Sequence, residues 1–481
     1  MTRGQEITVD TLDDIRALAS AAPDARELLP IGLREVTRGP AAIHTVADSL
    51  RRLGVTEGGV VAVLCDATPK SPGAGGGDVL DVVRDALAQG GRYRPVPVVV
   101  RPHGSAGLVH ADERTVAETV RRVAEVAPGS LVTVGSGTMA DLGKVAAQQL
   151  DLVHVVVQTA ASVNGFADNQ SVLLRNGTKR TTPSRWPDAL VIDSDVLAAA
   201  PRAMTCAGLG DQLSMFTASA DWYLAAAAGF DTTYSATVVQ VLRRGGREVL
   251  DEVDGLRHGS PHAVTALADG LTRGGLAMGL AGRTSPSSGT EHTISHLLEM
   301  HAGAHGVPAA SHGSQVGVAS VVAAAIWQRL RARFTERSVV LVHRLDEDEL
   351  RARVFAAFAQ LDADGATARE CWHAYRRKLE WINRNRDRLQ RLCTNWASHD
   401  AAAGDLLAAP ETLTGVLRDA GAPWRFSGLD PCPEFGTVHW AVRNCHLMRD
   451  RFTVVDLAEV TGLWTDDDVA DVLARTQWLV G

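Results

Sequence analysis

Long uninterrupted apolar stretches are missing from this sequence of 481 residues, and none of its segments is long enough to span a bilayer. The first residues also lack the apolar core of a signal peptide. Basic residues are not in excess, because 48 Lys and Arg stand against 56 Asp and Glu and give a net charge of −8. Phosphate backbones bind to basic surfaces, so the composition argues against nucleic acid as the main partner.

Cysteine is scarce and shows no pattern. The six cysteines are scattered without CxxC spacing, which is typical of free thiols in a reducing compartment. With 45% hydrophobic and 22% charged residues, a chain of this length can bury two cores. We therefore expect a cytoplasmic, enzyme-sized protein with two domains and no membrane insertion.

Strands alternate with helices in the first half of the chain. Runs of Val and Leu predict strands over residues 58–66, 96–101, 130–135, 151–159 and 189–195. Helical periodicity predicts helices over residues 44–53, 78–88, 113–126 and 139–149. Apolar strands separated by helices form a parallel sheet that is covered on both faces. We therefore predict an α/β domain with a Rossmann-like, dinucleotide-binding sheet over residues 1–197.

The pattern changes after about residue 195. Apolar residues then recur with the 3.6-residue period of helices, and no strand-like run of comparable strength follows. The sequence predicts an all-α helical domain over residues 198–481, which would bind metal and substrate.

The segment GSGTMADLGK, Gly135–Lys144, lies between a predicted strand and a predicted helix. Its glycines would let the backbone approach a pyrophosphate, and N–H groups at the helix N-terminus would bind the charge. The pattern is not GxGxxG, since Ala140 stands at the third glycine, and a tight turn without ligand also explains it. Asp66 follows a strand and is placed to bind an adenosine ribose, which favours NAD over NADP. A solvated loop aspartate is the alternative, and nearby Lys70 favours NADP.

The segment Ser288–Gly317 contains five histidines. A divalent metal site needs two or three neutral imidazoles and a carboxylate at short range. His292 near the start of a predicted helix and His312 after a break are the candidates, with Asp211 in GLGDQLS as the third ligand. Histidines one helical turn apart can equally belong to packed or solvated helix faces. The HExxH motif of metalloproteases is absent, because Glu291 precedes its histidine.

Several segments occur in an order that resembles the sn-glycerol-1-phosphate dehydrogenase family. This family lies within the superfamily of iron-containing alcohol dehydrogenases, glycerol dehydrogenases and dehydroquinate synthases. The resemblance extends from about Leu29 to Trp464 and implies the dehydroquinate synthase-like fold. The segments that carry it are GSGTMADLGK, TAASVNGFAD (Thr159–Asp168), AGLGDQLSMFTASADW (Ala207–Trp222), SSGTEHTISH (Ser287–His296), HGSQVGVAS and RDRFTVVDLAEVTGLW.

The resemblance implies roles for single residues. It places Asp211, His292 and His312 as ligands of a metal, for which zinc is favoured over nickel or iron. In the family's reaction NAD(P)H delivers hydride to dihydroxyacetone phosphate, whose carbonyl the metal polarises, and sn-glycerol 1-phosphate forms. It also implies a homodimer. The implied coenzyme-binding residues, apart from Asp66, are Gly135, Ser136, Gly137, Thr138 and Asp141, with Lys144 on the same helix, and Thr159 and Ser162 beneath the nicotinamide.

Two departures from the family pattern concern the substrate. Asn164 replaces an aspartate that faces the substrate in relatives, and an amide does not exchange protons at neutral pH. Ser285 stands where an arginine is expected, with Arg283 two residues earlier. Asn164 therefore joins the three metal ligands as a catalytic candidate, and a related ketone from specialised metabolism is an alternative substrate. Two different functions also fit the sequence: a dehydroquinate-synthase-like lyase or cyclase acting on a sugar phosphate, and a non-catalytic relative with the same fold.

Overall fold

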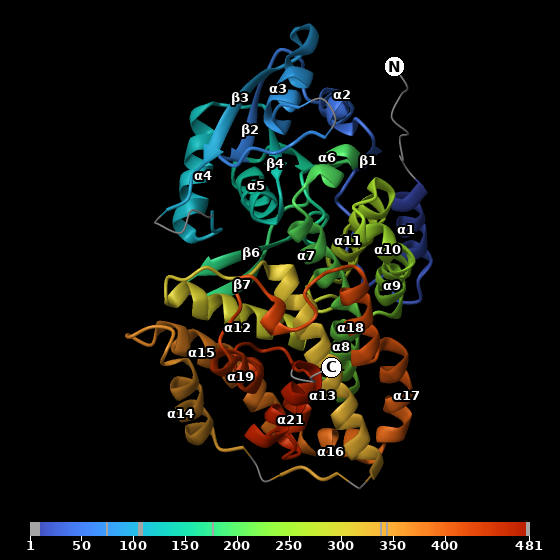
Figure 1. Cartoon of the computed structure of the whole chain (residues 1–481), viewed down its shortest axis with the longest axis vertical. Coiled ribbons are helices and arrows are strands. Elements are labelled where there is room, and N and C mark those ends of the chain that lie inside the picture. Colours follow the sequence, from blue (N-terminus) through green and yellow to red (C-terminus); the bar gives the residue numbers. More distant parts are fainter. Residues whose placement is uncertain are drawn as a thin grey trace. The chain divides into compact units, whose positions relative to one another are not determined.

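The computed structural model describes residues 10–73, 76–103, 109–175, 178–336, 339–342 and 345–477 (Figure 1). The chain forms two compact units. Unit 1 consists of the described residues up to Arg175, of Lys179–Gln212 and of Ser235–Thr284. Unit 2 consists of Leu213–Tyr234 and of the described residues from Ser285 onward.

Unit 1 is built on a six-stranded sheet in which every pair of neighbours is parallel. The strand order is β1-β8-β5-β4-β2-β3, and β6 and β7 form a separate two-stranded sheet. The strands are β1 (Glu35–Gly39), β2 (Val60–Asp66), β3 (Arg94–Val100), β4 (Ser130–Gly135), β5 (Val153–Gln158), β6 (Gln170–Arg175), β7 (Thr178–Pro183) and β8 (Ala189–Asp193).

Helices cover both faces of this sheet. Along β2, Val61, Val63 and Cys65 belong to one buried core, whereas Ala62 and Leu64 belong to the other. The first core also contains residues of α2 and α3, and the second contains residues of α4 and α5. Because successive strand residues point to opposite faces, the continuous apolar run of β2 contributes side chains to both cores. The predicted Rossmann-like α/β architecture is confirmed.

The helices of unit 1 include several that follow the sheet in sequence. α9 and α11 pack against each other, and α11 also packs against α6. The bounds are α1 (Asp10–Ala21), α2 (Val46–Arg52), α3 (Val79–Ala88), α4 (Glu113–Glu125), α5 (Gly137–Leu150), α6 (Ser194–Ala199), α7 (Arg202–Leu213), α9 (Ala236–Leu250), α10 (Val253–Arg257) and α11 (Pro261–Ala281). The units therefore divide the chain differently from the boundary predicted after residue 197. That boundary follows the change from strands to helices, whereas compactness depends on which helices pack together.

Unit 2 is helical, as predicted for the second half of the chain. Its helices are α8 (Met215–Ala228), α12 (Thr290–Ala304), α13 (His312–Glu336), α14 (Glu347–Phe358), α15 (Ala366–Arg384), α16 (Arg386–Thr394), α17 (Trp396–Leu406), α18 (Pro410–Asp419), α19 (Phe435–Asn444), α20 (Val454–Val460) and α21 (Asp466–Gln477). α13 packs against α8, α12 and α20, and its apolar residues between Val316 and Trp327 are buried. None of the helices in the described ranges is long and apolar enough to cross a membrane.

Some elements differ from the sequence-based prediction. The strands β1, β6 and β7 were not predicted, because each contains charged or polar residues among few apolar ones. In the helical part, α7 ends at Leu213 and α8 begins at Met215, with Ser214 between them. Consequently Asp211 lies in the last turn of α7.

Candidate active site

The coenzyme candidates of unit 1 lie where the order of strands in the sheet reverses. β2 pairs with β3 on one side and with β4 on the other, and β4 continues to β5. Cys65 of β2 is in register with Val134 of β4, so Asp66 and Gly135 end these neighbouring strands together. Open parallel sheets bind ligands at this position, outside the carboxyl ends of the strands. The structure thus brings Asp66 to the predicted coenzyme turn.

The turn after β4 is compact and leads directly into a helix. α5 begins at Gly137, with Ser136 as the N-cap residue and Thr138 in the first turn. A Cβ atom on Gly137 would lie 2.7 Å from Cγ2 of Val163, so packing against the chain itself requires this glycine. The first N–H groups of a helix have no partner within the helix and form a site for anions. A tight turn and a helix N-terminus of the kind that binds anions therefore coincide here.

A further glycine brings α5 close to the sheet. A Cβ atom on Gly143 would overlap Oγ1 of Thr133 and lie 2.8 Å from Nε2 of His154. Close packing of helix on strand is the task of the third glycine in dinucleotide-binding turns. In this chain Gly143 performs it instead of residue 140. The signal in the sequence is GxGxxxxxG, a spacing that the shorter motif does not cover.

Lys144 connects α5 to the segment that follows β5. Its fully buried Nζ lies 2.6 Å from Oδ1 of Asp168 and 3.3 Å from Oδ1 of Asp141, and it donates to the carbonyl oxygen of Gly165 at 2.8 Å. Burial alone disfavours the charged ammonium, but the two carboxylates outweigh burial and raise the pKa of Lys144. Asp141 also accepts a hydrogen bond from the backbone N–H of Val172 in β6. The predicted coenzyme residue Asp141 thus links α5 to β6.

Thr159 and Ser162 lie on the segment that Lys144 anchors. The backbone N–H of Thr159 donates to the carbonyl oxygen of Gly135 at 3.1 Å, and both side chains are buried. The segment is therefore attached to the coenzyme turn at its start and to α5 at its end, where Asp168 meets Lys144.

Asn164 and Asp211 contact each other within unit 1. The backbone N–H of Asn164 donates to Oδ2 of Asp211 at 2.8 Å, and Asp211 is buried. Gly274 and Gly275 of α11 make room for this segment, because a Cβ atom on Gly275 would lie 2.7 Å from the carbonyl oxygen of Asn164. Hydrogen bonds of this kind orient the carboxylates that bind metals.

In unit 2, Glu291 orients His292. Oε1 of the fully buried Glu291 lies 3.0 Å from Nδ1 of His292 and accepts from the N–H of Gly289 at 2.5 Å. Oε2 accepts from Oγ1 of Thr217 at 2.7 Å. Burial opposes ionisation of Glu291, but the hydrogen bonds from His292, Gly289 and Thr217 outweigh it and lower its pKa. An ionised carboxylate only accepts, so Nδ1 of His292 carries the proton and Nε2 presents a lone pair.

His312 begins α13 and faces His292. Their ring centroids are 5.3 Å apart, and Nδ1 of His312 lies 3.4 Å from Oε2 of Glu299 and 3.3 Å from Oγ of Ser295. At Nδ1, His292 has the carboxylate of Glu291 as its hydrogen-bond partner, whereas His312 has the hydroxyl of Ser295, with Glu299 at ion-pair distance. Partners of this kind orient histidines that bind metals. The donor chemistry fits a divalent cation.

Asp221 of the SADW segment holds the helices around these histidines. It accepts from the N–H and hydroxyl groups of Thr290 in α12, both at 2.8 Å, from the indole N–H of Trp327 in α13 at 3.1 Å, and from the N–H of Val454 in α20 at 2.9 Å. Burial, together with the neighbouring charge of Glu291, raises the pKa of Asp221 to about 7. α8, α12, α13 and α20 are thus joined at one buried carboxyl group.

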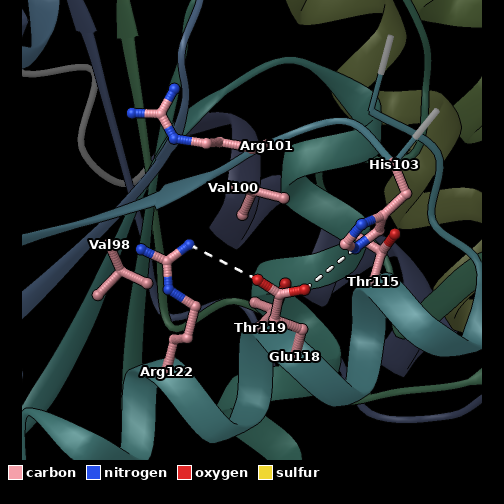
Figure 2. A pocket seen from close by; sticks show the side chains of 8 residues that line it. All are labelled: Val98, Val100, Arg101, His103, Thr115, Glu118, Thr119 and Arg122. Atoms are coloured by element: carbon pink, nitrogen blue, oxygen red, sulfur yellow. Dashed lines mark ion pairs between the residues drawn. The ribbon is translucent and has the colours of Figure 1, made fainter. Parts of the chain in front are cut away.

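A small pocket lies apart from these residues, between β3 and α4 (Figure 2). Glu118 forms ion pairs there with His103 at 3.1 Å and with Arg122 at 3.9 Å. None of the predicted site residues lines it. Glu118 is thus paired with two neighbours, and Arg101 is a further basic residue of the lining.

Other residues of the site were not predicted from the sequence. His296 stacks on His312 with ring centroids 5.4 Å apart, and Nδ1 of His296 lies 2.7 Å from the guanidinium of Arg449. Glu291 entered the sequence argument only as evidence against a protease motif. The pair Glu-His was visible in the sequence, whereas Arg449 lies too far along the chain for any spacing rule to find it.

Comparison with known proteins identifies the family. A family model described as iron-containing alcohol dehydrogenase matches residues 39–201. A glycerol-1-phosphate dehydrogenase (NAD(P)+) from Bacillus subtilis is 30% identical over 303 residues, which are 63% of this chain and 73% of the relative. A glycerol-1-phosphate dehydrogenase (NAD(P)+) from Bacillus velezensis is 34% identical over 232 residues, 48% of this chain and 58% of that relative.

Solved structures agree on the fold. An iron-containing alcohol dehydrogenase from Thermococcus thioreducens superposes with a TM-score of 0.56 at 13% identity, over 94% of this chain and all of that chain. The chain therefore belongs to the glycerol-1-phosphate dehydrogenase family of NAD(P)-dependent, metal-containing alcohol dehydrogenases.

Proposed function

We propose that this chain reduces dihydroxyacetone phosphate to sn-glycerol 1-phosphate with NAD(P)H at a divalent metal. The observation that carries the proposal is the pair of imidazoles of His292 and His312, each with a carboxylate oxygen within 3.4 Å of Nδ1. The names of the relatives contain glycerol 1-phosphate and NAD(P)+, and the family resemblance supplies dihydroxyacetone phosphate as the ketone. A lyase or cyclase reaction has no comparable support.

We propose Asp211, His292 and His312 as the metal ligands. His292 would bind through Nε2, His312 would supply the second imidazole, and Asp211 would supply a carboxylate that the N–H of Asn164 orients. Two nitrogen ligands and one oxygen ligand suit zinc, and nickel or iron accept the same donors. When bound, the cation would polarise the ketone carbonyl and the coenzyme would supply hydride.

For the coenzyme we propose the turn Gly135–Thr138 as the pyrophosphate site, Thr159 and Ser162 as contacts of the nicotinamide end, and Asp66 as the ribose contact. Asp66 favours NAD, because a carboxylate repels a 2′-phosphate. Lys70 lies 2.8 Å from Asp66 and offsets part of this repulsion. NADPH should therefore be compared directly with NADH.

Asn164 would face the substrate as an amide that donates and accepts hydrogen bonds without releasing a proton. Its backbone N–H also orients Asp211, so both the side-chain amide and the backbone of Asn164 would act in the site. Ser285, buried and neutral, leaves the positive charge for a phosphate to other residues of the chain.

We further propose that the protein works as a homodimer in the cytoplasm. The homodimer rests on the family resemblance. All six cysteines are free thiols and five of them are buried, which suits a reducing compartment.

The test is NADH oxidation by the zinc-loaded protein, followed by near-ultraviolet absorbance. Dihydroxyacetone phosphate, unphosphorylated dihydroxyacetone and NADPH are compared in parallel. We expect turnover with the phosphate, and loss of both metal and turnover in His292→Ala. The matched control is His301→Ala at a half-buried position of the same helix α12, which should behave as wild type. Failure of the wild-type protein to turn over the phosphate while it binds metal and NADH, or full activity of a metal-free His292→Ala, would refute the proposal.

A further inference from the structure

The small pocket between β3 and α4 lies beside the predicted ribose contact Asp66. Leu64 of β2 and Val98 of β3 are in register and belong to the same buried core. Two residues further on, Asp66 is in register with Val100, which lines the pocket, so both residues point to that same face of the sheet. Neighbouring strands are about 4.8 Å apart, so the pocket begins one strand away from Asp66. Residues of α5, which follows the predicted pyrophosphate turn, belong to this core as well.

The lining of this pocket has more basic than acidic groups. Glu118, its acidic residue, forms ion pairs with His103 at 3.1 Å and with Arg122 at 3.9 Å. Arg101 is exposed and has no ion-pair partner among the described residues (Figure 2). The hydroxyl of Thr119, which is 2% exposed, has no hydrogen-bond partner in the described part of the chain. Because the carboxylate of the lining is already paired while a guanidinium is not, the pocket favours an anionic ligand.

We propose that Arg101 binds the 2′-phosphate of NADPH and thereby lets this chain use NADPH as well as NADH. This inference rests on the proposed function, in which Asp66 contacts the adenosine ribose. The 2′-phosphate is attached to that ribose, and an arginine near the ribose-binding carboxylate accommodates it in sheets of this kind. Guanidinium groups bind phosphates through two N–H donors and keep their charge. Lys70 already contacts Asp66 at 2.8 Å, so its charge is largely used there.

The first experiment measures coenzyme affinity without substrate, by fluorescence titration of the zinc-loaded protein with NADPH and with NADH. In Arg101→Met the Kd for NADPH should rise about tenfold or more, because a hydrogen-bonded charge pair with the phosphate is lost, while the Kd for NADH should change less than about twofold. Arg101→Lys keeps the charge and should recover part of the loss. The matched control is Arg114→Met at an exposed position of α4, which removes the same charge outside the lining and should leave both Kd values as in wild type.

The outcomes separate this inference from the proposed function. An unchanged Kd for NADPH in Arg101→Met, or an equal rise for NADPH and NADH, would overturn the assignment of Arg101 and leave the proposed function intact. Binding of NADH without NADPH by the wild-type protein would also overturn it. A wild-type protein that binds neither coenzyme would instead contradict the proposed function.

The second experiment tests the charge balance of the pocket and the source of the phosphate. Glu118→Gln leaves His103 and Arg122 without their counter-charge, so we expect NADPH to bind severalfold more tightly and NADH to bind as in wild type. Inorganic phosphate shares the chemistry of the 2′-phosphate, and as a competitor it should weaken NADPH binding more than NADH binding in the wild-type protein but not in Arg101→Met. Phosphate that binds at Arg101 without weakening NADPH binding, or unchanged NADPH affinity in Glu118→Gln, would overturn the inference.

Discussion

The substitution Lys144→Met tests whether one buried ion pair holds the coenzyme-binding half of the site together. Lys144 has no exposed side-chain surface, and its ammonium contacts carboxylates on both sides, Asp141 of α5 and Asp168 of the following segment. Methionine is also unbranched, is one atom shorter, and removes the charge and the three donors. Asp168, whose pKa burial already raises to about 6, would then be left buried without its counter-ion.

The loss of folding stability in Lys144→Met can be estimated from the burial of the ion pair. Removing one partner of a buried ion pair costs about 3–5 kcal/mol, since the remaining charge has lost its compensation. A domain with about 5–15 kcal/mol of stability survives this loss, so the variant should fold. The segment from Thr159 to Asp168 would become looser, and ordering even one of its residues upon binding costs about 1–2 kcal/mol. We therefore expect the Kd for NADH to rise by about tenfold.

Hydrogen exchange of residues 159–168 and fluorescence titration with NADH measure the two effects separately. The matched control is Lys378→Met in unit 2. Lys378 is equally buried and lies 2.7 Å from Asp456, so its loss should destabilise the protein without changing the Kd for NADH. If Lys144→Met shows wild-type exchange and wild-type NADH affinity, the reasoning about this ion pair is wrong.

Two further predictions concern the metal and the pH dependence. Glu291→Gln should weaken metal binding by about 10–100-fold while the protein stays folded, because the amide no longer fixes the proton on Nδ1 of His292; equal metal affinities in a chelator competition would contradict this. Burial, followed by the charges of Lys144 and Arg185, lowers the pKa of His154 to about 3. The unfolded chain therefore takes up this proton at higher pH than the folded chain, and stability should fall as the pH drops below about 6.5, by about 2 kcal/mol at pH 5. Urea unfolding at several pH values measures this slope, which should decrease in His154→Gln and would count against the assignment if it did not.

Much of the fold could be predicted from the sequence because the patterns are local. Continuous Val and Leu runs such as β2 indicate strands buried on both faces, and regular helical periodicity indicates helices, so the α/β and helical parts were recognised. β6 and β7 were not predicted because polar and charged residues make up half or more of each strand, and the two strands are stabilised by pairing with each other. The grouping of α9 and α11 with the sheet unit also depends on packing between distant segments.

In the candidate site, too, some residues could be predicted from the sequence, whereas others became visible only in the structure. Motifs in the sequence supplied the residue types at Gly135–Thr138, Asp211, His292 and His312, because these motifs are short and ordered along the chain. Spacing alone could not distinguish His296 from its neighbours, since His292, His296 and His312 look alike in sequence. Their difference lies in partners that folding brings from elsewhere, Arg449 for His296 and Glu299 for His312.

The sequence by itself determined the alternation of strands and helices, the glycine turn and the identities of the metal-binding candidates, because each depends on residues that are close along the chain. Only the tertiary structure decided that Lys144 is a buried counter-ion, that Gly143 brings α5 onto the sheet, and which side chains contact the ring nitrogens of each histidine. The physical reason is that charge and hydrogen-bond direction depend on the nearest atoms in space, and in this protein those atoms come from distant parts of the chain.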